Sequence, residues 1–476
     1  MSEKVGNISS FSSESTMVPA NLSWLSVELS SLKTTTHSPL LNWLTECRLT
    51  SGLKVQSTAW TDLQDWQHGG PFLEHRTGKF FKVASLPWFS GSNTDAPIQP
   101  IILQPEIGIL GFVVAQQNSQ PHILIQAKTE PGNVGGTQLA PSVQATVSNY
   151  TRVHGGTPTP FLDLFLDQTT GSVVSDSLQS EQGTRFLGKY NRNMTVVINS
   201  ILEVEDNRYR WFLVKDLLSL LSVDFCINTD ARSVLVASDW SVLAGQPPFI
   251  RHFSKGGFGE HLYHSMVSED NHCLSSTISI VKRLKQLQSP YTKLALSPLA
   301  LSLAEGWEKR QDGLYDKLGK NYDVKLFTIA TGDREVSQWQ QPLIMSCQEQ
   351  EIILLTQQKY GILHFLLKVS REPGFKEGVQ LGPSVQSEIY PKDPLLLFCH
   401  QANSRTLIRV RQSDEGGRFL NSIATYSLLE VMPDEPVPRS SEDFWVSLGQ
   451  IYRLLKIPGA LTNEARSALS LVLLWL

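Results

Sequence analysis

Polar side chains that can bind or move a proton gather between Gln126 and His154. They are Gln126, Lys128, Glu130, Asn133, Gln138, Gln144, Ser148, Asn149, Tyr150, Arg152 and His154. Because side chains alternate along a strand, Gln126, Lys128 and Glu130 would share one face of it. That face is either solvated, as most charged residues are, or the floor of a polar pocket, and the spacing favours neither alternative.

A second polar group follows at helical spacing. Glu181, Arg185, Lys189 and Arg192 lie three or four residues apart, so a helix over residues 179–190 would carry its cations on one face. Guanidinium groups match the oxygens of phosphates, and the patch therefore suits a diphosphate. The alternative is an exposed helix with a Glu181–Arg185 ion pair, which is the commoner role of a lone basic helix.

The elements that must position these groups occur twice in the chain. Without a gap, residues of the first group return later as the pairs Glu130/Glu372, Pro131/Pro373, Gly132/Gly374, Gln138/Gln380, Leu139/Leu381, Pro141/Pro383, Ser142/Ser384, Val143/Val385 and Gln144/Gln386. At a slightly shorter offset, residues 179–187 return as residues 412–420. We therefore predict two copies of one domain.

The two copies differ in their reactive residues. The second copy keeps the scaffold residues, but Ser370 stands in the place of Lys128 and Lys392 in the place of Tyr150. The segment 152–154 has no counterpart. We therefore expect the first copy to be catalytic and the second to hold a degenerate pocket or to act as a brace.

Length and composition agree with two domains. The chain has 476 residues, which suits two domains of about 200 residues each. With 41 Lys+Arg and 45 Asp+Glu, the formal net charge is −4, so neither a nucleic-acid surface nor binding to acidic membranes is indicated. The five cysteines are scattered, form no zinc motif and favour reduced thiols in a cytoplasmic protein.

The pattern of apolar and turn residues predicts an α+β fold with short elements. We expect a disordered Ser-rich tail over 1–37, a first repeat over 38–238, a linker over 239–276 and a second repeat over 277–476. Strands of a mixed or antiparallel sheet are expected between residues 101 and 127, and helices at 38–44, 161–165, 179–190, 210–221, 277–288 and 298–307. The apolar segment 467–476 is too short to span a bilayer, and we expect a helix packed on the second domain.

The sequence shows no motif for a metal or a cofactor. His154, His252, His261 and His264 are not at the spacing of metal ligands. Neither a GxGxxG turn after a strand, a phosphate-loop lysine motif nor a GxSxG elbow occurs. Cofactor-free chemistry is therefore expected.

Three long runs carry a resemblance to a known family: residues 98–114, 125–156 and 178–198. They resemble the NDP-hexose 2,3-dehydratase family of deoxysugar biosynthesis. The resemblance covers residues 63–235 and 307–471 and departs at Pro97, where Trp339 of the second copy would lead us to expect an aromatic residue. It implies a tandem duplication of a Nudix-hydrolase-like mixed-sheet domain, a homodimer and a dTDP-4-keto-6-deoxyhexose substrate. Because the metal-binding helix of Nudix hydrolases is absent from both copies, diphosphate hydrolysis is not expected.

The resemblance also implies the reaction. A base would remove the proton on carbon 3, which the ketone at carbon 4 acidifies. Loss of the hydroxyl at carbon 2 would give an enol that tautomerises to the 3,4-diketo-2,6-dideoxy sugar, the substrate of a downstream 3-ketoreductase. Our catalytic candidates are His154 as base or acid, Tyr150 as donor to the leaving group, Lys128 at the ketone, and Glu130 as base or as the partner of Lys128. The alternative role of His154 is to cap a turn.

Binding roles follow from the same resemblance. For the diphosphate the candidates are Arg185, Lys189, Arg192 and Arg152, and further polar contacts would come from Gln126, Asn149 and Gln144. Trp66 or Trp88 would stack on the thymine, although large aromatic residues more often fill cores. In the second copy, the candidates for a nucleotide pocket without turnover are Arg371, Gln380, Gln386 and Arg418.

Two other functions compete with this one. A nucleotide-sugar binding protein would bind in both copies without reaction, but the presence of Lys128, Tyr150 and His154 in the first copy argues against it. A Nudix-type diphosphatase would need the metal-binding helix that the sequence lacks.

Overall fold

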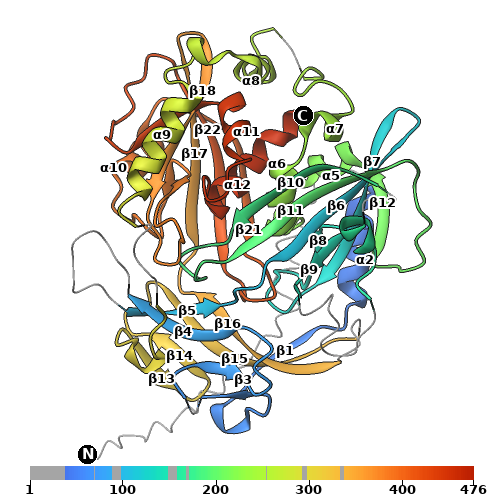
Figure 1. Ribbon diagram of the computed structural model, residues 1–476, viewed down its shortest axis with the longest axis vertical. Helices are drawn as coiled ribbons and strands as arrows, with labels where there is room; N and C mark the ends of the chain where they lie inside the picture. Colours follow the sequence, from blue (N-terminus) through green and yellow to red (C-terminus); the bar gives the residue numbers. More distant parts are fainter. Residues whose placement is uncertain are drawn as a thin grey trace, which may run out of the picture. The chain divides into compact units, whose positions relative to one another are not determined.

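The computed structural model describes residues 38–68, 70–87, 98–147, 158–167, 171–252, 255–291, 297–332 and 337–476 (Figure 1). The second of two units of the chain, Pro39–Leu476, holds a mixed α+β fold whose described strands join four sheets. We call residues 38–238 the first half and residues 277–476 the second half.

A mixed seven-stranded sheet is the frame of the first half. Its strand order is β10-β11-β6-β7-β12, with β8 added to β7 and β9 added to β6. The strands are β6 (Gly108–Gln117), β7 (Gln120–Thr129), β8 (Thr137–Ala140), β9 (Val143–Ala145), β10 (Ser172–Ser180), β11 (Tyr190–Ile198) and β12 (Tyr209–Leu213). β11 runs parallel to β6, whereas the other described pairings are antiparallel. Val113, Leu124 and Val196 are fully buried on it, as expected for aliphatic side chains on a packed sheet face.

The second half has a seven-stranded sheet with the same arrangement. Its order is β21-β22-β17-β18-β23, with β19 added to β18 and β20 added to β17. The strands are β17 (Gln350–Lys359), β18 (Ile362–Ser370), β19 (Gln380–Gly382), β20 (Val385–Gln386), β21 (Ser404–Ser413), β22 (Ile423–Val431) and β23 (Asp443–Ser447). β17 and β22 are parallel, like β6 and β11. The register shifts between Val173 and Ser175 in one sheet and between Thr406 and Ile408 in the other, so the two sheets agree even in this irregularity.

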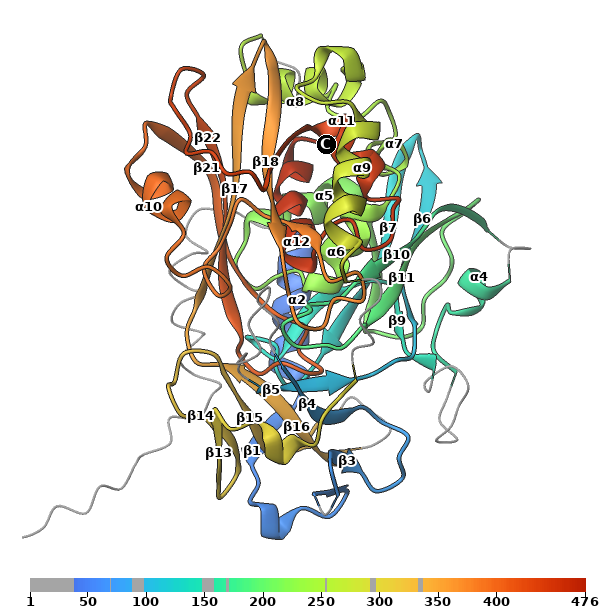
Figure 2. The same cartoon turned by 60° about the vertical axis from the view of Figure 1, so that its left-hand side comes forward.

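Two smaller sheets join the halves (Figure 2). Their strands are β1 (Lys54–Ser57), β2 (Trp66–Gln67), β3 (Leu73–His75), β4 (Lys82–Pro87), β5 (Ile98–Leu103), β13 (Trp307–Arg310), β14 (Gly313–Asp316), β15 (Tyr322–Ala330) and β16 (Gln338–Ser346). β1 of the first half pairs with β15 of the second, and Leu299 of the second half bridges to Ser85 on β4 of the first. A common hydrophobic cluster contains Trp66, Phe81 and Trp307. The first half therefore adds a strand to a sheet of the second half, and the second half adds a bridge to a sheet of the first.

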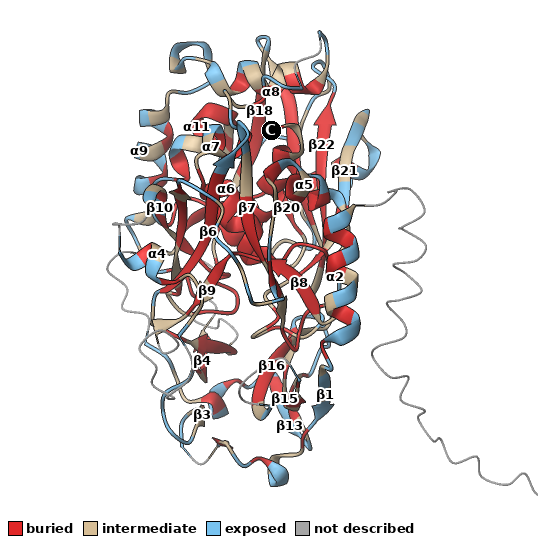
Figure 3. Cartoon of the chain, turned by 90° about the vertical axis from the view of Figure 1, so that its right-hand side faces the viewer, coloured by how far each residue is buried: buried red, intermediate tan, exposed pale blue. Residues whose placement is uncertain are grey.

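Of the helices, α6 and α12 lie between the two seven-stranded sheets (Figure 2). The described helices are α2 (Pro39–Thr50), η2 (Trp60–Asp62), α4 (Asp163–Leu166), α5 (Val214–Ser219), η3 (Leu220–Ser222), α6 (Thr229–Ala237), α7 (Trp240–Ala244), α8 (Phe258–Val267), η4 (Asp270–His272), α9 (Thr277–Gln288), η5 (Leu301–Leu303), α10 (Pro394–Gln401), α11 (Leu448–Leu454), α12 (Asn463–Leu469) and η6 (Ser470–Trp475). α6 and α12 pack on each other, and every residue of both is buried (Figure 3). Asn228 and Thr462 cap their N-termini with side-chain oxygens, which fixes where each helix begins.

The prediction of a helix over residues 179–190 is wrong. This segment ends β10, makes a turn and begins β11, and the backbone N–H of Glu181 donates to the carbonyl oxygen of Lys189 at 3.0 Å. The cause is tertiary, because the N–H of Thr184 donates to Glu372 of the second half at 3.0 Å. The cations of this segment therefore do not share a helix face.

Other expected elements are confirmed or shifted. The helices expected at 38–44 and 277–288 are confirmed as α2 and α9. The helix expected over 210–221 begins only at Val214, because the preceding residues form β12, and residues 298–307 hold only the short η5 before β13. Residues 239–276 contain α7, α8 and η4. The terminal η6 contacts α12, but also α5, η3 and α6 of the first half, so its packing is not confined to the second half.

Candidate active site

The strand face that carries Lys128 and Glu130 is the floor of a buried polar cluster. Lys128 lies near the end of β7, and Glu130 opens the turn that follows. Lys128 Nζ lies 3.1 Å from Glu130 Oε1, and their side chains are only 17% and 4% exposed. Of the two alternatives for this face, the structure therefore supports the polar pocket.

The two carboxylate oxygens of Glu130 differ in their hydrogen-bond partners. Gln144 Nε2 donates to Glu130 Oε1 at 3.4 Å, and Asn228 Nδ2 donates to Gln144 Oε1 at 3.3 Å. Glu130 Oε2 is buried and finds no hydrogen-bond donor among the residues that the structure describes. A buried carboxylate oxygen without a partner is costly, so a donor from an ordered water or a ligand would stabilise it.

Three further carboxylates interact with this pair. Glu181 lies just after β10 and accepts hydrogen bonds from Asn191 Nδ2 at 2.7 Å and from Asn463 Nδ2 at 3.0 Å. Asp230 lies in the first turn of α6, where desolvation and the carboxylates of Glu181 and Glu415 raise its pKa well above the usual range. We call Lys128, Glu130, Glu181, Asp230 and Glu415 the Glu130 cluster. A buried group of carboxylates with fewer cations holds protons that acid–base chemistry can use.

Glu415 and Arg418 reach this site from the second half, on the β21–β22 loop. The N–H of Gly132 donates to the carbonyl oxygen of Gly416 at 2.8 Å, and the N–H of Asn421 donates to that of Gly132 at 3.0 Å. A Cβ atom on Gly132 would lie 1.4 Å from the carbonyl oxygen of Phe419, so the loop can approach only a glycine.

The side chain of Arg418 contacts the first half. It does not lie in the nucleotide pocket of the second half, where we expected it. Its Nε donates to Gln104 Oε1 at 3.2 Å, and its guanidinium group lies 4.2 Å from the centre of the Phe81 ring. The reason is the crossing of the β21–β22 loop, which the sequence comparison of the two copies cannot show.

Arg185 makes the opposite crossing, on the β10–β11 loop. The N–H of Gly374 donates to the carbonyl oxygen of Gly183 at 2.8 Å, and Arg185 forms a buried ion pair with Glu388 of the second half. Its guanidinium group also lies 4.0 Å from the centre of the Tyr322 ring. Arg185 therefore belongs to the second half's pocket and not to the site around Glu130.

The other two cations expected at a diphosphate point elsewhere. Lys189 Nζ donates to the carbonyl oxygen of Glu106. Arg192 Nε donates to Asp176 Oδ1 at 2.7 Å on a neighbouring exposed strand. Because Arg185, Lys189 and Arg192 face three different partners, the combined diphosphate patch predicted from the sequence does not form.

The second pocket is a small polar cavity of ≈ 20 Å³. We use this name for Gln182, Arg185, Gln386, Glu388, Asp414 and Glu464, which line it. Desolvation raises the pKa of Asp414 to about 8 and that of Glu464 to about 7. With the Arg185–Glu388 pair in place, the cavity has room for about one water molecule.

The remaining second-copy candidates do not line this cavity. Gln380 accepts a hydrogen bond from Ser180 Oγ at 2.7 Å, and Arg371 Nη1 donates to Glu442 Oε2 at 2.9 Å. Of the four residues expected there, only Gln386 lines the cavity.

Trp66 has the core role that the sequence analysis named as the alternative. It is 2% exposed, belongs to the cluster that joins the smaller sheets, and donates from Nε1 to the carbonyl oxygen of Gln340 at 2.6 Å. Gln126 is half-buried on β7 beside the site. Five candidates lie outside the described residues: Trp88, Asn149, Tyr150, Arg152 and His154.

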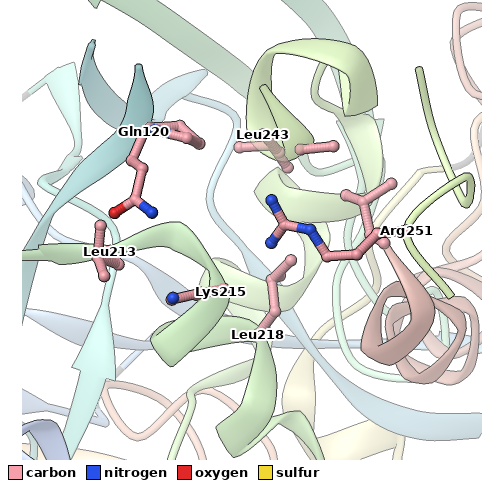
Figure 4. A pocket seen from close by; sticks show the side chains of 9 residues that line it. Gln120, Leu213, Lys215, Leu218, Leu243 and Arg251 are labelled. Atoms are coloured by element: carbon pink, nitrogen blue, oxygen red, sulfur yellow. The ribbon is translucent and has the colours of Figure 1, made fainter. Parts of the chain in front are cut away.

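Another depression lies at the opposite end of β7 (Figure 4). It is lined by Gln120, Leu213, Lys215, Leu218, Leu243 and Arg251, among others. Because a strand rises about 3.3 Å per residue, Gln120 and Lys128 are roughly 25 Å apart. The depression is therefore separate from the Glu130 cluster.

The described ranges contain neither a candidate metal site nor a candidate membrane-spanning helix. No group of three or more His, Cys, Asp and Glu side chains in them is arranged to hold a metal ion. In the same part of the chain, no helix has the length and apolar character to cross a membrane.

Two residues of the Glu130 cluster, Asp230 and Glu415, were not predicted from the sequence. Asp230 precedes Ala231-Arg232-Ser233, a motif that returns as Ala465-Arg466-Ser467, and an acid precedes both copies. That repeated acid was the available signal. Glu415 left no such signal, because its counterpart in the first half is Gln182.

Buried carboxylates and a lysine that meet on a mixed sheet are groups suited to proton transfer. Residues 37–237 and 280–472 match the family model described as NDP-hexose 2,3-dehydratase. The chain belongs to the NDP-hexose 2,3-dehydratase family, and it is a dehydratase, a hydro-lyase.

Similar proteins agree with the family. A Saccharopolyspora spinosa protein named dTDP-4-dehydro-6-deoxy-alpha-D-glucopyranose 2,3-dehydratase is 33% identical over 422 residues, which cover 85% of this chain and 84% of its own. A Streptomyces violaceoruber protein of the same name is 30% identical over 444 residues, which cover 90% and 95%. A solved structure described as an ADP compounds hydrolase aligns with 32% of this chain and 83% of its own, at 16% identity and a TM-score of 0.21.

Proposed function

We propose that this chain removes water from a dTDP-4-keto-6-deoxyhexose to give the dTDP-3,4-diketo-2,6-dideoxyhexose of deoxysugar biosynthesis. The names of the relatives support the substrate. The observation that carries the proposal is the Lys128–Glu130 pair, which is buried and has one carboxylate oxygen without a hydrogen-bond donor among the described residues.

The proposed reaction needs three kinds of group. A base takes the proton from carbon 3, and the electron pair enters the enolate of the carbon 4 ketone. Donors stabilise the enolate oxygen, and an acid protonates the hydroxyl that leaves carbon 2. The enol then takes a proton at carbon 2 and becomes the 3,4-diketone, so that one water is lost overall.

We assign Lys128 to the enolate oxygen, because an ammonium group stabilises the negative charge that develops there. Glu130 either takes the proton from carbon 3 or holds Lys128 in place. His154 and Tyr150 remain candidates for base and for donor to the leaving group, on the family resemblance. No metal or redox cofactor enters this scheme.

The sugar nucleotide would be held by Gln126, Gln144, Asn149, Arg152 and Trp88. Gln126 lies on β7 with Lys128, and Gln144 on β9 donates to Glu130, whereas the other three are proposed on the resemblance alone. The second pocket is proposed as a degenerate nucleotide pocket whose phosphate-binding cation, Arg185, is neutralised by Glu388.

We further infer that the two halves are copies of one Nudix-hydrolase-like domain, with a linker over 239–276. The agreement of strand order, parallel pair and bulge between the two large sheets supports the duplication. A homodimer, a cytoplasmic location and a downstream 3-ketoreductase follow from the resemblance. The five cysteines are free thiols, which agrees with a reducing compartment.

The test is to incubate the purified protein with dTDP-4-keto-6-deoxyglucose in deuterated water, without added metal or nicotinamide. Mass spectrometry and NMR should show loss of one water and entry of deuterium at carbon 2. A sugar that binds but stays intact would favour a binding protein. Release of a nucleoside monophosphate on addition of magnesium would favour a diphosphatase.

A further inference from the structure

We propose that Glu415, which the second half supplies on the β21–β22 loop, is the acid that protonates the hydroxyl leaving carbon 2. The inference rests on the proposed dehydration and adds a catalytic residue to the same site.

The loop that carries Glu415 is fixed against the turn that carries Glu130. In addition to the two backbone hydrogen bonds of Gly132, Gln138 Nε2 donates to Ser413 Oγ at 2.8 Å in the buried interior. The loop approaches so closely that a Cβ atom on Gly416 would lie 2.3 Å from Asn133 Oδ1. Glu415 is therefore placed by contacts on both sides of its position in the chain.

Glu415 is the most accessible carboxylate of the Glu130 cluster. Glu130, Glu181 and Asp230 are buried, whereas Glu415 is half-buried. Its Oε1 accepts a hydrogen bond from the N–H of Gly417 at 2.9 Å. A carboxylic acid that is oriented by the backbone and still reachable from solvent can touch a substrate.

The charges around Glu415 favour a bound proton. It faces the carboxylates of Glu130 and Glu181 and the cations of Lys128 and Arg418. Asp230, Lys189, Glu106 and Arg466 interact with the same residues, so the electrostatic group has five carboxylates and four cations: Glu106, Glu130, Glu181, Asp230, Glu415, Lys128, Lys189, Arg418 and Arg466. An uncompensated negative charge in such surroundings has a high free energy, so the group keeps a proton.

The pKa of Glu415 agrees with this proton count. Desolvation, followed by the charge of Glu130, raises its pKa to about 7. A carboxyl group with a pKa near the working pH is suited to give a proton to a leaving hydroxide.

The second pocket offers an internal comparison. The residue equivalent to Glu415 is Gln182, which donates from Nε2 to Asp414 Oδ1 at 3.0 Å. An amide cannot supply the proton that the leaving group needs. The pocket with Lys128 thus has an acid at this position, and the pocket with Ser370 does not.

The proposed step balances. When the bond between carbon 2 and oxygen breaks, the enolate electrons form the double bond between carbons 2 and 3 and restore the ketone at carbon 4. The proton of Glu415 goes to the departing oxygen, which leaves as water. On ketonisation the hydroxyl at carbon 3 returns a proton to Glu415, and carbon 2 takes a proton from the base, which has exchanged with the solvent.

The variant that tests this is Glu415→Gln, which copies Gln182. In deuterated water, proton exchange at carbon 3 should continue because the base is intact, while loss of water should slow by about 10²- to 10⁴-fold with KM little changed. In the wild type, kcat/KM should fall as the pH rises through about 7, and this fall should be absent from the residual activity of the variant.

The control is Glu308→Gln on β13, an exposed carboxyl group in a surface ion pair, which should keep turnover within about twofold of wild type. A Glu415→Gln protein that loses water within tenfold of the wild-type rate would overturn the proposal. So would a folded variant that binds the sugar but no longer exchanges the proton at carbon 3, because the defect would then lie before the leaving step.

If Glu415→Gln does not fold, Glu415→Asp tests the same point. It keeps an acid on a shorter side chain, so water loss should slow at least tenfold while the fall above pH 7 persists; an unchanged rate or a flat profile would contradict the acid role. Wild-type protein that releases no water at all would instead overturn the dehydration itself.

Discussion

Glu130 is a buried carboxylate that is only half satisfied. One oxygen is held by Lys128 and Gln144, and the other finds no donor in the described part of the chain. Native structures rarely keep such an atom, and when they do, it is usually at a site where a ligand completes the shell. Glu130 is therefore the residue around which we interpret the chemistry.

We predict that Glu130→Gln lowers kcat by about 10²- to 10⁴-fold. Both roles proposed for Glu130 need its negative charge, and the amide has almost the same shape, so the fold should persist. Steady-state kinetics with the keto sugar and circular dichroism would check this. Turnover near the wild-type rate in a folded variant would remove Glu130 from the mechanism.

Asp414 gives a pH dependence of stability. Because desolvation raises its pKa from 3.8 to about 8, the folded state keeps a proton that the unfolded state releases above roughly pH 4. Its contribution to stability is therefore full below pH 4 and is lost as the pH rises toward 8. We predict that the Tm of Asp414→Asn exceeds that of the wild type by more at pH 8 than at pH 5.

Differential scanning fluorimetry across this pH range would measure the difference. The exposed Glu308→Gln serves as the control, because its side chain is 45% exposed in a surface ion pair and such pairs contribute little. Parallel Tm curves for wild type and Asp414→Asn would contradict the prediction.

Much of the residue-level site was open to prediction. The alternation of Gln126, Lys128 and Glu130 predicts that they share one face of a strand. The absence of a counterpart of Lys128 in the second copy indicates that the first copy is catalytic. Burial of that face could not be predicted, because it depends on a loop from a distant part of the chain. Glu415 was missed for the same reason.

At the scale of elements, the two crossing loops explain both the errors and the site. The charges between residues 181 and 192 are helical in spacing, but the segment is held open by Glu372 and Gly374 of the second half. Such long-range contacts override local preference. Strand alternation and capping residues, in contrast, are local, which is why α2, α9 and the strands between residues 101 and 127 could be predicted.

We predict that Gly132→Ala lowers both stability and turnover. Its Cβ would lie 1.4 Å from the carbonyl oxygen of Phe419, so the β21–β22 loop must move, at a cost of about 1–3 kcal/mol or more. The movement displaces Arg418 and Glu415 from the Glu130 cluster. We expect a Tm lower by several degrees.

Gly374→Ala is the matched variant in the other crossing. Its Cβ would lie 1.8 Å from the carbonyl oxygen of Phe186, so it should lower Tm similarly but reduce turnover much less, since it disturbs the second pocket. Gly306→Ala, with open space at its Cβ, should change neither. Equal loss of turnover in Gly132→Ala and Gly374→Ala would argue against separate roles for the two pockets.

At the scale of the whole described unit, the halves are interlocked. β1 completes a sheet with β15, Leu299 bridges to β4, and α6 packs on α12. Each half holds all strands of its own seven-stranded sheet, but α6 and α12 are buried against each other across the halves. The sequence predicted two repeats, but not that they exchange strands and loops, because an exchange leaves the pattern within each repeat unchanged.

We predict that the protein unfolds in one cooperative transition. Two independent domains would melt separately, whereas interlocked halves lose their shared core together. Scanning calorimetry should give a single peak whose calorimetric and van't Hoff enthalpies agree. Two resolved peaks would show that the contacts between the halves contribute little to stability.

The crossing of the β21–β22 loop also bears on how a chain with the proposed duplication can evolve. After a duplication, one copy is usually free to drift once the other carries the activity. Here Gly416 and Arg418 lie in one copy and contact the neighbourhood of Glu130 in the other. Natural selection on the chemistry of the first copy therefore acts on codons of the second, and deletion of either copy removes part of both pockets.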